Sequence, residues 1–379
     1  MLSVLYQQNH PTIAKTSTEN MDPSDDGLGL PWRPIFTIER SRRPEVTVYG
    51  IVSLVTGSAA PGSDSIIATR QLMGKGDINY QLWSRSLLKP WQLLNHIHVL
   101  KAAYPNLKPE HYALFMASHS AEPGHMQLLD EVAAVTAISE KQLKCPAAAP
   151  LSQETKDRIK NSSERNARRY HNCSGKHMAY LAAVTAEGRN AGDYLVESEL
   201  QHSRLKKIMA ALTGRPEETF LHTTDGCQLP NYALSPLELA SFYLSLLSEN
   251  KPQFADSLIA PCAPFYSELG ALMSQFPRTI SGGNRLDYKL MAQNLLGNGD
   301  LKIVAKEGAD GLLGLGVAPG SKYPNGLGMC IKLSSGFDNR HMELITREVF
   351  ERLGLIEPLP KAAADMDHIK THFHFELKR

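Results

Sequence analysis

The sequence lacks the features that mark membrane, secreted and nucleic-acid-binding proteins. No apolar run reaches the roughly 20 residues that a membrane-spanning helix requires. Residues 1–8 have neither the basic start nor the long apolar stretch of a signal peptide. Lysine and arginine number 40 and aspartate and glutamate 39, so the net charge of +1 gives no attraction to nucleic acid or to an anionic membrane. We therefore expect a cytoplasmic protein that binds neither nucleic acid nor a membrane.

Cysteine is also scarce, with five residues in a chain of 379. Few cysteines, odd in number, argue against a disulfide framework and are typical of reduced thiols in a cytosolic enzyme. The remaining composition, 42% hydrophobic and 21% charged, indicates a globular protein with one large core or two moderate ones. The five cysteines are Cys145, Cys173, Cys227, Cys262 and Cys330.

The chain divides into two polar ends and a long central part. Residues 1–30 are polar and predict a flexible N-terminal tail. Residues 359–379 are predicted to form a C-terminal tail. Its three histidines are interpreted as part of a solvated segment, in preference to a metal site. Residues 31–358 are expected to form one folded domain, with a helical insertion at about residues 120–280.

Strand-like runs lie near both ends of this domain. Apolar alternation or continuous apolar runs predict strands at Val46–Val55, Ile66–Leu72, Tyr112–Met116, Lys302–Lys306 and Gly328–Leu333. A turn at residues 60–64 is predicted to join the first two strands. Apolar residues at spacings of three and four predict helices at Ser86–Leu100, Gly124–Val135, Gly175–Thr185, Leu200–Leu212, Pro236–Leu247 and Asn339–Leu353. We therefore predict an α/β (α+β) fold with one sheet built from both chain ends and helices inserted between them.

Ser86 and Lys89 form the first candidate for catalysis. Because they are three residues apart, their side chains share one face of a helix that starts near Ser86. A serine hydroxyl becomes a nucleophile when a neighbouring base takes its proton, and a lysine serves as that base where burial or a second cation lowers its pKa. The same spacing also occurs by chance on solvated helices, so the pair needs support from other motifs.

A row of polar side chains follows the predicted strand at Tyr112–Met116. It contains Ser118, His119, Ser120 and Glu122. Several polar groups at the end of a strand are typical of catalytic sites, but a helix N-cap with a satisfied histidine explains the pattern equally well.

Cys173 and Cys227 lie in separate turns and are candidate zinc ligands, since zinc prefers thiolate. Lys176 follows Cys173 by three residues and can point the same way, and its amine can bind a metal once deprotonated. Two cysteines without a CxxC spacing are a weak signal, so buried structural thiols remain an alternative.

Lys306 lies where a strand-like run passes into a turn that contains Gly308. From this position its ammonium could face a reacting oxyanion. A lysine on an edge strand is the common alternative.

Five motifs in this order resemble those of the rhizobial-type, or class 3, L-asparaginases, also called the asparaginase II family. The resemblance runs from about Arg33 to Leu355. The motifs are Arg85-Ser86-Leu87-Leu88-Lys89-Pro90, Ala117-Ser118-His119-Ser120-Ala121-Glu122, His171-Asn172-Cys173-Ser174-Gly175-Lys176-His177, Asp225-Gly226-Cys227 and Ala305-Lys306-Glu307-Gly308-Ala309-Asp310-Gly311.

This resemblance implies the fold of serine β-lactamases, penicillin-binding proteins and related glutaminases. It also implies a homodimer that hydrolyses L-asparagine to L-aspartate and ammonia. The implied catalytic residues are Ser86, Lys89, Ser118 and Lys306. The implied zinc ligands are Cys173, Lys176 and Cys227. We expect substrate contacts from Arg85, His119, Glu122, His177, Asp225 and Gly308.

Arg85 and Asp225 are the candidates for binding the substrate's α-carboxylate and α-amine, because opposite charges suit a zwitterion. Zinc is expected to orient the substrate or fix the loops, since two thiolates lower its Lewis acidity.

Three positions depart from the family pattern. Ala121 stands where glycine is usual, and Gln228 follows Cys227 where a small residue is usual. Glu307 replaces a glycine beside Lys306, and its carboxylate is expected to raise the pKa of Lys306 and weaken it as a base.

In the expected mechanism, Lys89 takes the proton of Ser86, Ser86 attacks the side-chain amide, and water releases aspartate from the acyl-enzyme. Ser118 and Lys306 relay protons, and backbone N–H groups near Ser86 stabilise the oxyanion. A glutaminase or a penicillin-recognising acyl enzyme is the alternative, since Lys306-Glu307-Gly308 loosely matches a Lys-Thr-Gly motif. A non-catalytic amino-acid or zinc sensor is the third hypothesis.

Overall fold

The computed structural model describes residues 29–58, 69–163, 165–249, 251–252, 254–292, 295, 301–358 and 368–378. Within these residues the main sheet has seven strands in the order β10-β1-β2-β9-β8-β7, with β3 also paired to β2. All of the pairs are antiparallel. The strands are β1 (Arg33–Arg40), β2 (Arg43–Gly57), β3 (Thr69–Lys75), β7 (Ile303–Gly308), β8 (Leu312–Val317), β9 (Leu327–Leu333) and β10 (Ile369–Phe373).

The long strand β2 joins the two ends of the chain. Its first half pairs with β1, its second half with β3, and its other side pairs with β9. The predicted fold class, a mixed α/β fold whose sheet is built from both chain ends, is therefore confirmed. The β2–β3 hairpin is confirmed as well, although its turn at residues 60–64 lies outside the described residues. The predicted N-terminal tail lies outside them up to residue 28.

A second, small sheet contains β4 (Leu82–Trp83), β6 (Pro230–Leu234) and β5 (His222–Thr224). β4 leads directly into the 3₁₀ helix η1 (Arg85–Leu88) and then into α1 (Lys89–Ala103). Pairing of β4 with β6 therefore brings the start of α1 next to the chain around residue 230.

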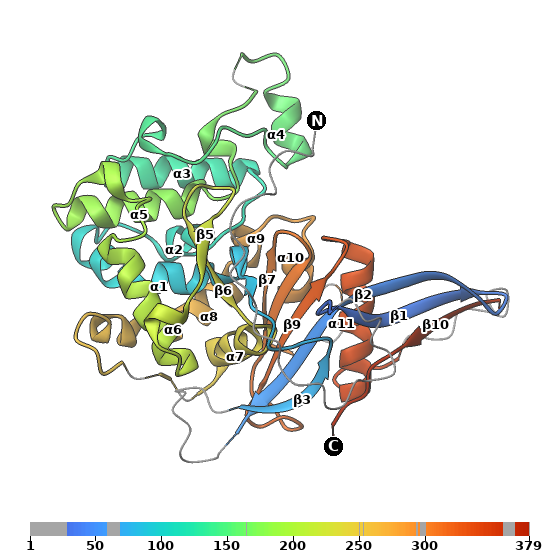
Figure 1. The fold of residues 1–379 in the computed structure, drawn as a ribbon. Coiled ribbons are helices and arrows are strands. Elements are labelled where there is room, and N and C mark those ends of the chain that lie inside the picture. Colours follow the sequence, from blue (N-terminus) through green and yellow to red (C-terminus); the bar gives the residue numbers. More distant parts are fainter. Residues whose placement is uncertain are drawn as a thin grey trace.

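Helices fill the chain between the two halves of the main sheet. Figure 1 shows most of them clustered beside the β7 end of the sheet, whereas β1 and β10 lie at the other end. The α-helices after α1 are α2 (Pro109–Phe115), α3 (Pro123–Thr136), α4 (Gln153–Arg158), α5 (Ser174–Ala186), α6 (Leu200–Thr213), α7 (Pro236–Leu247), α8 (Tyr266–Gln275), α9 (Pro277–Ile280), α10 (Leu286–Met291) and α11 (Asn339–Leu353). Further 3₁₀ helices are η2 (Glu140–Gln142), η3 (Arg168–Tyr170), η4 (Ala191–Asp193), η5 (Glu217–Thr219) and η6 (Ala260–Phe265).

Helix α7 packs against β2, β8 and β9 and links the sheet to η1. It begins with a capping box, in which the Ser235 hydroxyl accepts from the Glu238 N–H and the Glu238 carboxylate accepts from the Ser235 N–H. The hydroxyl of Tyr243 donates to the Leu87 carbonyl at 2.9 Å, so α7 directly supports the turn that holds Ser86.

The predicted strand at Tyr112–Met116 is wrong, because Tyr112–Phe115 lie in α2 and Met116 is its C-cap. Pro109 occupies the first turn, and the His111 ring accepts from the Lys108 N–H at 3.1 Å, which starts a helix at this point. The run is buried among α3, α5 and α8, and a short run buried on all sides has no periodicity that separates strand from helix.

The C-terminal segment also differs from the expected solvated tail, because Ile369–Phe373 forms β10 on the outer edge of β1. His372 contacts Glu39 at 3.2 Å and His374 contacts Thr37 at 2.8 Å. Strands β1 and β8 were not predicted either. β8 is buried along its whole length, so it shows no alternation. Among the described residues, no helix is long and apolar enough to cross a bilayer.

Candidate active site

A cavity of about 380 Å³ lies where η1, the end of β7 and the segment before α10 meet. Its size falls within the range of about 300–1,000 Å³ that is usual for small-molecule sites. It brings together six segments that are far apart in the sequence. The lining residues are Ser86, Ser118, Asn172, Arg285, Glu307, Gly308, Ala309, Phe337 and Asn339.

Ser86 lies in η1, immediately before α1. The turn is held by Asn231 of β6, whose side-chain oxygen accepts from the Ser84 hydroxyl at 3.2 Å and from the Arg85 N–H at 3.0 Å. Arg85 has a φ of 48°, a left-handed conformation that is uncommon outside glycine. The buried Leu87 and Leu88 anchor the other side of the turn, so the Ser86 side chain is left at the cavity.

Lys89 is the first residue of α1, and its side chain is fully buried. Its amine contacts the Ser118 hydroxyl at 2.9 Å and donates to the Ala117 carbonyl. Within the described part of the chain, no hydrogen bond joins this amine to the Ser86 hydroxyl. Burial, followed by the positive charges of Lys176 and Lys306, lowers the pKa of Lys89 to about 8.

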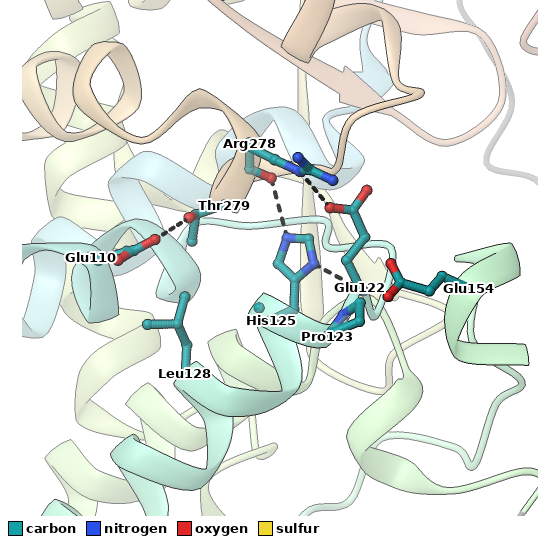
Figure 2. Close-up of a pocket in the computed structure, with 9 residues that line it drawn as sticks. Glu110, Glu122, Pro123, His125, Leu128, Glu154, Arg278 and Thr279 are labelled. Atoms are coloured by element: carbon teal, nitrogen blue, oxygen red, sulfur yellow. Dashed lines mark hydrogen bonds and ion pairs between the residues drawn. The ribbon is translucent and has the colours of Figure 1, made fainter. Parts of the chain in front are cut away.

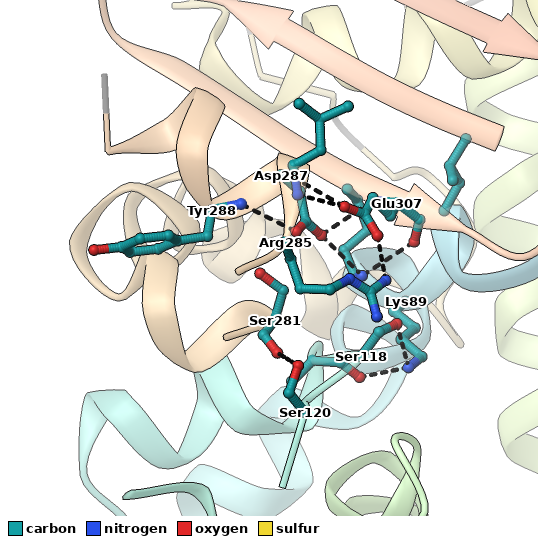
Figure 3. A network of polar contacts seen from close by, with 12 residues as sticks. Lys89, Ser118, Ser120, Ser281, Arg285, Asp287, Tyr288 and Glu307 are labelled. Atoms are coloured by element: carbon teal, nitrogen blue, oxygen red, sulfur yellow. Dashed lines mark hydrogen bonds and ion pairs between the residues drawn. The ribbon is translucent and has the colours of Figure 1, made fainter. Parts of the chain in front are cut away.

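Lys306 lies on β7 and is also fully buried. Its amine approaches the Asp287 carboxylate at 3.4 Å and donates to the Glu307 carbonyl at 3.1 Å (Figure 3). Burial lowers the pKa of Lys306, and the Asp287 carboxylate opposes this shift. The two predicted lysines therefore differ in their partners, a hydroxyl for Lys89 and a carboxylate for Lys306.

Glu307 is buried, and its carboxylate is held by other groups. It forms an ion pair with Arg285 and accepts from the N–H of Leu286 at 2.6 Å, at the start of α10 (Figure 3). Its charge raises the pKa of Lys306, as expected, but Asp287 raises it more. The expected direction of the effect on the pKa of Lys306 is therefore correct. The larger effect comes from Asp287, which the sequence did not single out.

The three predicted zinc ligands converge in a buried position. The Lys176 amine lies 3.2 Å from the Cys227 sulfur, and the two thiols share a hydrogen bond. Donation from Cys227 holds the pKa of Cys173 well below its usual value and raises that of Cys227. The pKa of Lys176 is raised because the two thiol groups outweigh its burial.

The two sulfurs are ligands that zinc prefers, and the Lys176 nitrogen would join them once it loses its proton to make room for the metal. Within the described residues, no group of three or more histidine, cysteine, aspartate or glutamate side chains could hold a metal. A zinc site here would therefore depend on the lysine as its third ligand.

Arg85 and Asp225, predicted to bind the α-groups of a substrate, bind each other. The Arg85 guanidinium donates to the Asp225 carboxylate at 2.7 Å and also pairs with Asp310. Neither Arg85 nor Asp225 lines the cavity.

His119 and His177 are fully buried and serve local contacts. The His119 Nδ1 accepts from the Ala121 N–H at 3.1 Å, so its Nε2 carries the proton and donates to the Ser174 hydroxyl at 2.8 Å. The His177 Nδ1 lies 2.7 Å from the Tyr194 hydroxyl. Burial lowers the pKa of both rings, so both are neutral near pH 7.

Glu122 lines a second pocket of about 360 Å³ (Figure 2), whose lining includes neither Ser86 nor Ser118. Its carboxylate pairs with Arg278 at 2.8 Å and accepts from the Gly283 N–H at 2.7 Å. Of the six predicted substrate contacts, only Gly308 lines the cavity that holds Ser86 and Ser118.

Two of the departures from the family pattern fall on left-handed backbone. Ala121 has a φ of 57° and Gln228 a φ of 76°. Glycine adopts this region without steric cost. The structure thus gives a reason why a glycine or a small residue suits these two positions.

The L-asparaginase II family model matches residues 66–376. The chain belongs to the L-asparaginase II family. It is therefore an asparaginase-type amidohydrolase, with a substrate of the asparagine type. A search of curated proteins found no match to this chain.

Solved structures with some similarity include a glutaminase and a carbapenemase, the kinds of protein whose fold the resemblance implied. The glutaminase YbgJ of Bacillus subtilis, solved as a covalent complex with 5-oxo-L-norleucine, shares 12% identity over 80% of this chain and 88% of its own, with a TM-score of 0.33. The carbapenemase VCC-1 of Vibrio cholerae shares 11% identity over 80% of this chain and 94% of its own, with a TM-score of 0.34. At TM-scores below 0.5 these similarities carry no further argument.

Arg285 and Asp287 are residues of the site that the sequence analysis missed. They follow the turn Ser281-Gly282-Gly283-Asn284, whose two glycines and asparagine are a recognisable loop signal. Pairs of charges beside such a turn in a helical region could have been marked as site candidates. What the sequence does not show is the pairing of α10 with β7, which brings them to Lys306.

Proposed function

We propose that the chain hydrolyses L-asparagine to L-aspartate and ammonia through an acyl-enzyme formed on Ser86. The observation that carries the proposal is a cavity lined by two serine hydroxyls, one of them bonded to a buried lysine whose pKa lies near 8, in a member of the L-asparaginase II family.

The hydrogen bond between Lys89 and Ser118 and the position of both serines on one cavity wall support a proton relay. The neutral Lys89 amine accepts the proton of Ser118 while Ser118 takes that of Ser86, so the nucleophile is activated through a relay. The Ser86 oxygen then attacks the side-chain amide carbon of the substrate. The amide nitrogen leaves as ammonia, with the proton returned from Lys89.

Hydrolysis of the ester reverses the relay. Water loses a proton to Lys89, attacks the acyl carbon and releases aspartate and the Ser86 hydroxyl. Lys306 supports both halves by its charge: the Asp287 carboxylate opposes the fall in its pKa that burial causes, and its positive charge lowers the pKa of Lys89.

Zinc belongs to the proposal as a separate component. Cys173, Lys176 and Cys227 would hold it, and it would supply a fixed positive charge that ties two turns together and helps to orient the substrate's α-groups. The homodimer and the cytoplasmic location are likewise proposed.

Ammonia release from L-asparagine and L-glutamine, and ring opening of a β-lactam followed by absorbance, each measured with and without a chelator, test the reaction class. We expect turnover of L-asparagine above the other two. Absence of ammonia from L-asparagine would overturn the proposal.

A diazo-ketone analogue of asparagine tests the nucleophile, because such compounds alkylate an activated hydroxyl. Peptide mass spectrometry should locate the adduct on Ser86 in the wild type and in the Lys306→Met variant. Ser86→Ala should form no adduct and lose more than about a thousandfold in rate. An adduct on Ser118 would reverse the roles of the two serines.

A further inference from the structure

The cavity has one permanent cation on its wall. Among the described residues that line it, Arg285 is the only one with a positive charge. An amino-acid substrate has an α-carboxylate that must be matched when it leaves water, because an unpaired charge in a closed site is costly. Arg285 is therefore the group in the wall whose charge fits that carboxylate.

The guanidinium of Arg285 is only partly used by the protein. One of its nitrogens pairs with the Glu307 carboxylate, and its Nε–H is buried without a hydrogen-bond partner among the described residues, so the remaining N–H groups of the two terminal nitrogens are the donors nearest the cavity. Arginine has five N–H donors, so donors remain for a second, planar anion. A quarter of the side chain stays accessible although most of the residue is packed in the wall.

Glu307 fixes the position of this guanidinium. Its carboxylate is held by the Leu286 N–H at 2.6 Å, and its backbone N–H donates to Asp287 at 3.1 Å. Figure 3 shows Arg285 extending from the start of α10, with its guanidinium between Glu307 and the pair formed by Ser118 and Lys89. The family's usual glycine at this position could not make this ion pair.

Arg85, the cation first expected to bind the carboxylate, is already matched. It pairs with both Asp225 and Asp310 and does not line the cavity. The charge of Arg85 is therefore matched by two carboxylates outside the cavity, whereas that of Arg285 is matched by one carboxylate within its wall.

We propose that Arg285 binds the α-carboxylate of the substrate and that Glu307 is the positioning residue for its guanidinium. This inference rests on the proposed amidohydrolase function and specifies its substrate class, free α-amino acids with a side-chain amide. A substrate whose α-carboxylate is blocked as an amide would lose this contact.

The test compares two substrates in three enzymes. L-asparagine carries the α-carboxylate, and L-asparagine α-amide lacks its charge; hydrolysis of the side-chain amide is followed as L-aspartate or L-isoasparagine by chromatography. Arg285→Gln should lower kcat/KM for L-asparagine about 10- to 100-fold, mainly through KM, since a hydrogen bond to a charged group is lost. The value for the α-amide should change less than about threefold, and Arg285→Lys should restore part of the loss for L-asparagine.

Arg215→Gln is the matched control, because Arg215 has nearly the same exposure, 24% against 25%, and also pairs with a glutamate, Glu238. It should leave the ratio of the two substrates unchanged. Equal losses on both substrates in Arg285→Gln would overturn the inference and show a structural role. A wild type without activity on L-asparagine would instead overturn the proposed function.

Discussion

At the scale of single residues, Lys89 and Lys306 are both buried, but different neighbouring groups act on the pKa of each. Both are fully buried, which disfavours the ammonium form. The hydroxyl and the carbonyl beside the Lys89 amine carry no charge, and Cys173 opposes the effect of burial on its pKa only in part, whereas the Asp287 carboxylate faces the Lys306 amine directly. Lys89 is therefore better suited to be the base and Lys306 to be the neighbouring charge.

The pH dependence of the reaction follows from this division. A base must be neutral to accept a proton, so activity should be absent well below the pKa of Lys89 and rise with pH through about 8. A profile of kcat/KM between pH 6 and 10 measures it. A profile that is flat over pH 7–9 would contradict a lysine base, and Lys89→Arg should be inactive throughout.

Asp287→Asn identifies which lysine controls that profile. Without the carboxylate, the pKa of Lys306 falls and its charge is partly lost, so Lys89 feels less repulsion and its own pKa rises. The rising limb should therefore move to higher pH. A move to lower pH would show instead that Lys306 is the base.

The metal prediction also concerns single residues. Cys173→Ser or Cys227→Ser should remove bound zinc, because each takes away one of two sulfur ligands. KM should rise more than kcat falls, since the metal is assigned to orientation. Metal analysis by mass spectrometry measures the first effect, with Cys330→Ser, a buried thiol on β9, as control. Full zinc occupancy in both variants would contradict the assignment.

At the scale of elements, α7 lies close enough to the sheet that only glycine fits beneath it. A Cβ built on Gly328 of β9 would lie 2.0 Å from the Ala240 carbonyl oxygen of α7, which is backbone that cannot rotate away. Gly328→Ala should therefore destabilise the protein by about 3 kcal/mol. Because Tyr243 of α7 holds the turn of Ser86, kcat should fall as well.

Gly124→Ala is the matched control in α3, since a Cβ there meets nothing within 4 Å. It should be neutral or stabilise the protein by up to about 1 kcal/mol. Urea unfolding of both variants measures the difference. A Gly328→Ala protein as stable as Gly124→Ala would show that α7 moves freely on the sheet.

Elements with clear local signals could be predicted from the sequence, and elements defined by their surroundings could not. α11 has a regular apolar stripe and ends at Gly354, which has a φ of 62°, and it was predicted at its observed bounds. α2 was mistaken for a strand because it is buried on all sides. The predicted catalytic motifs could be recognised because each is a short run of the sequence, whereas the Arg285–Glu307 pair forms only where α10 packs against β7.

At the scale of the whole molecule, the site and the C-terminal strand lie at opposite edges of the sheet. β7 carries Lys306, Glu307 and Gly308, and β10 lies at the far edge, separated from β7 by the four strands β1, β2, β9 and β8. Loss of β10 should therefore affect stability without reaching the cavity.

Deletion of residues 368–379 tests this separation. It removes the buried Phe375, on which the Arg352 guanidinium stacks at 4.8 Å, and the pairing of β10 with β1. Burial of one aromatic side chain contributes about 1.5–3 kcal/mol, so thermal unfolding should shift to a lower temperature, and the exposed edge of β1 should promote aggregation on warming. Well below that temperature, kcat/KM per folded molecule should match the full chain. Phe375→Ala separates packing from edge pairing: it should lower Tm but keep the edge covered and the protein unaggregated. A truncated protein that stays folded yet loses activity would show that β10 acts on the site through the sheet.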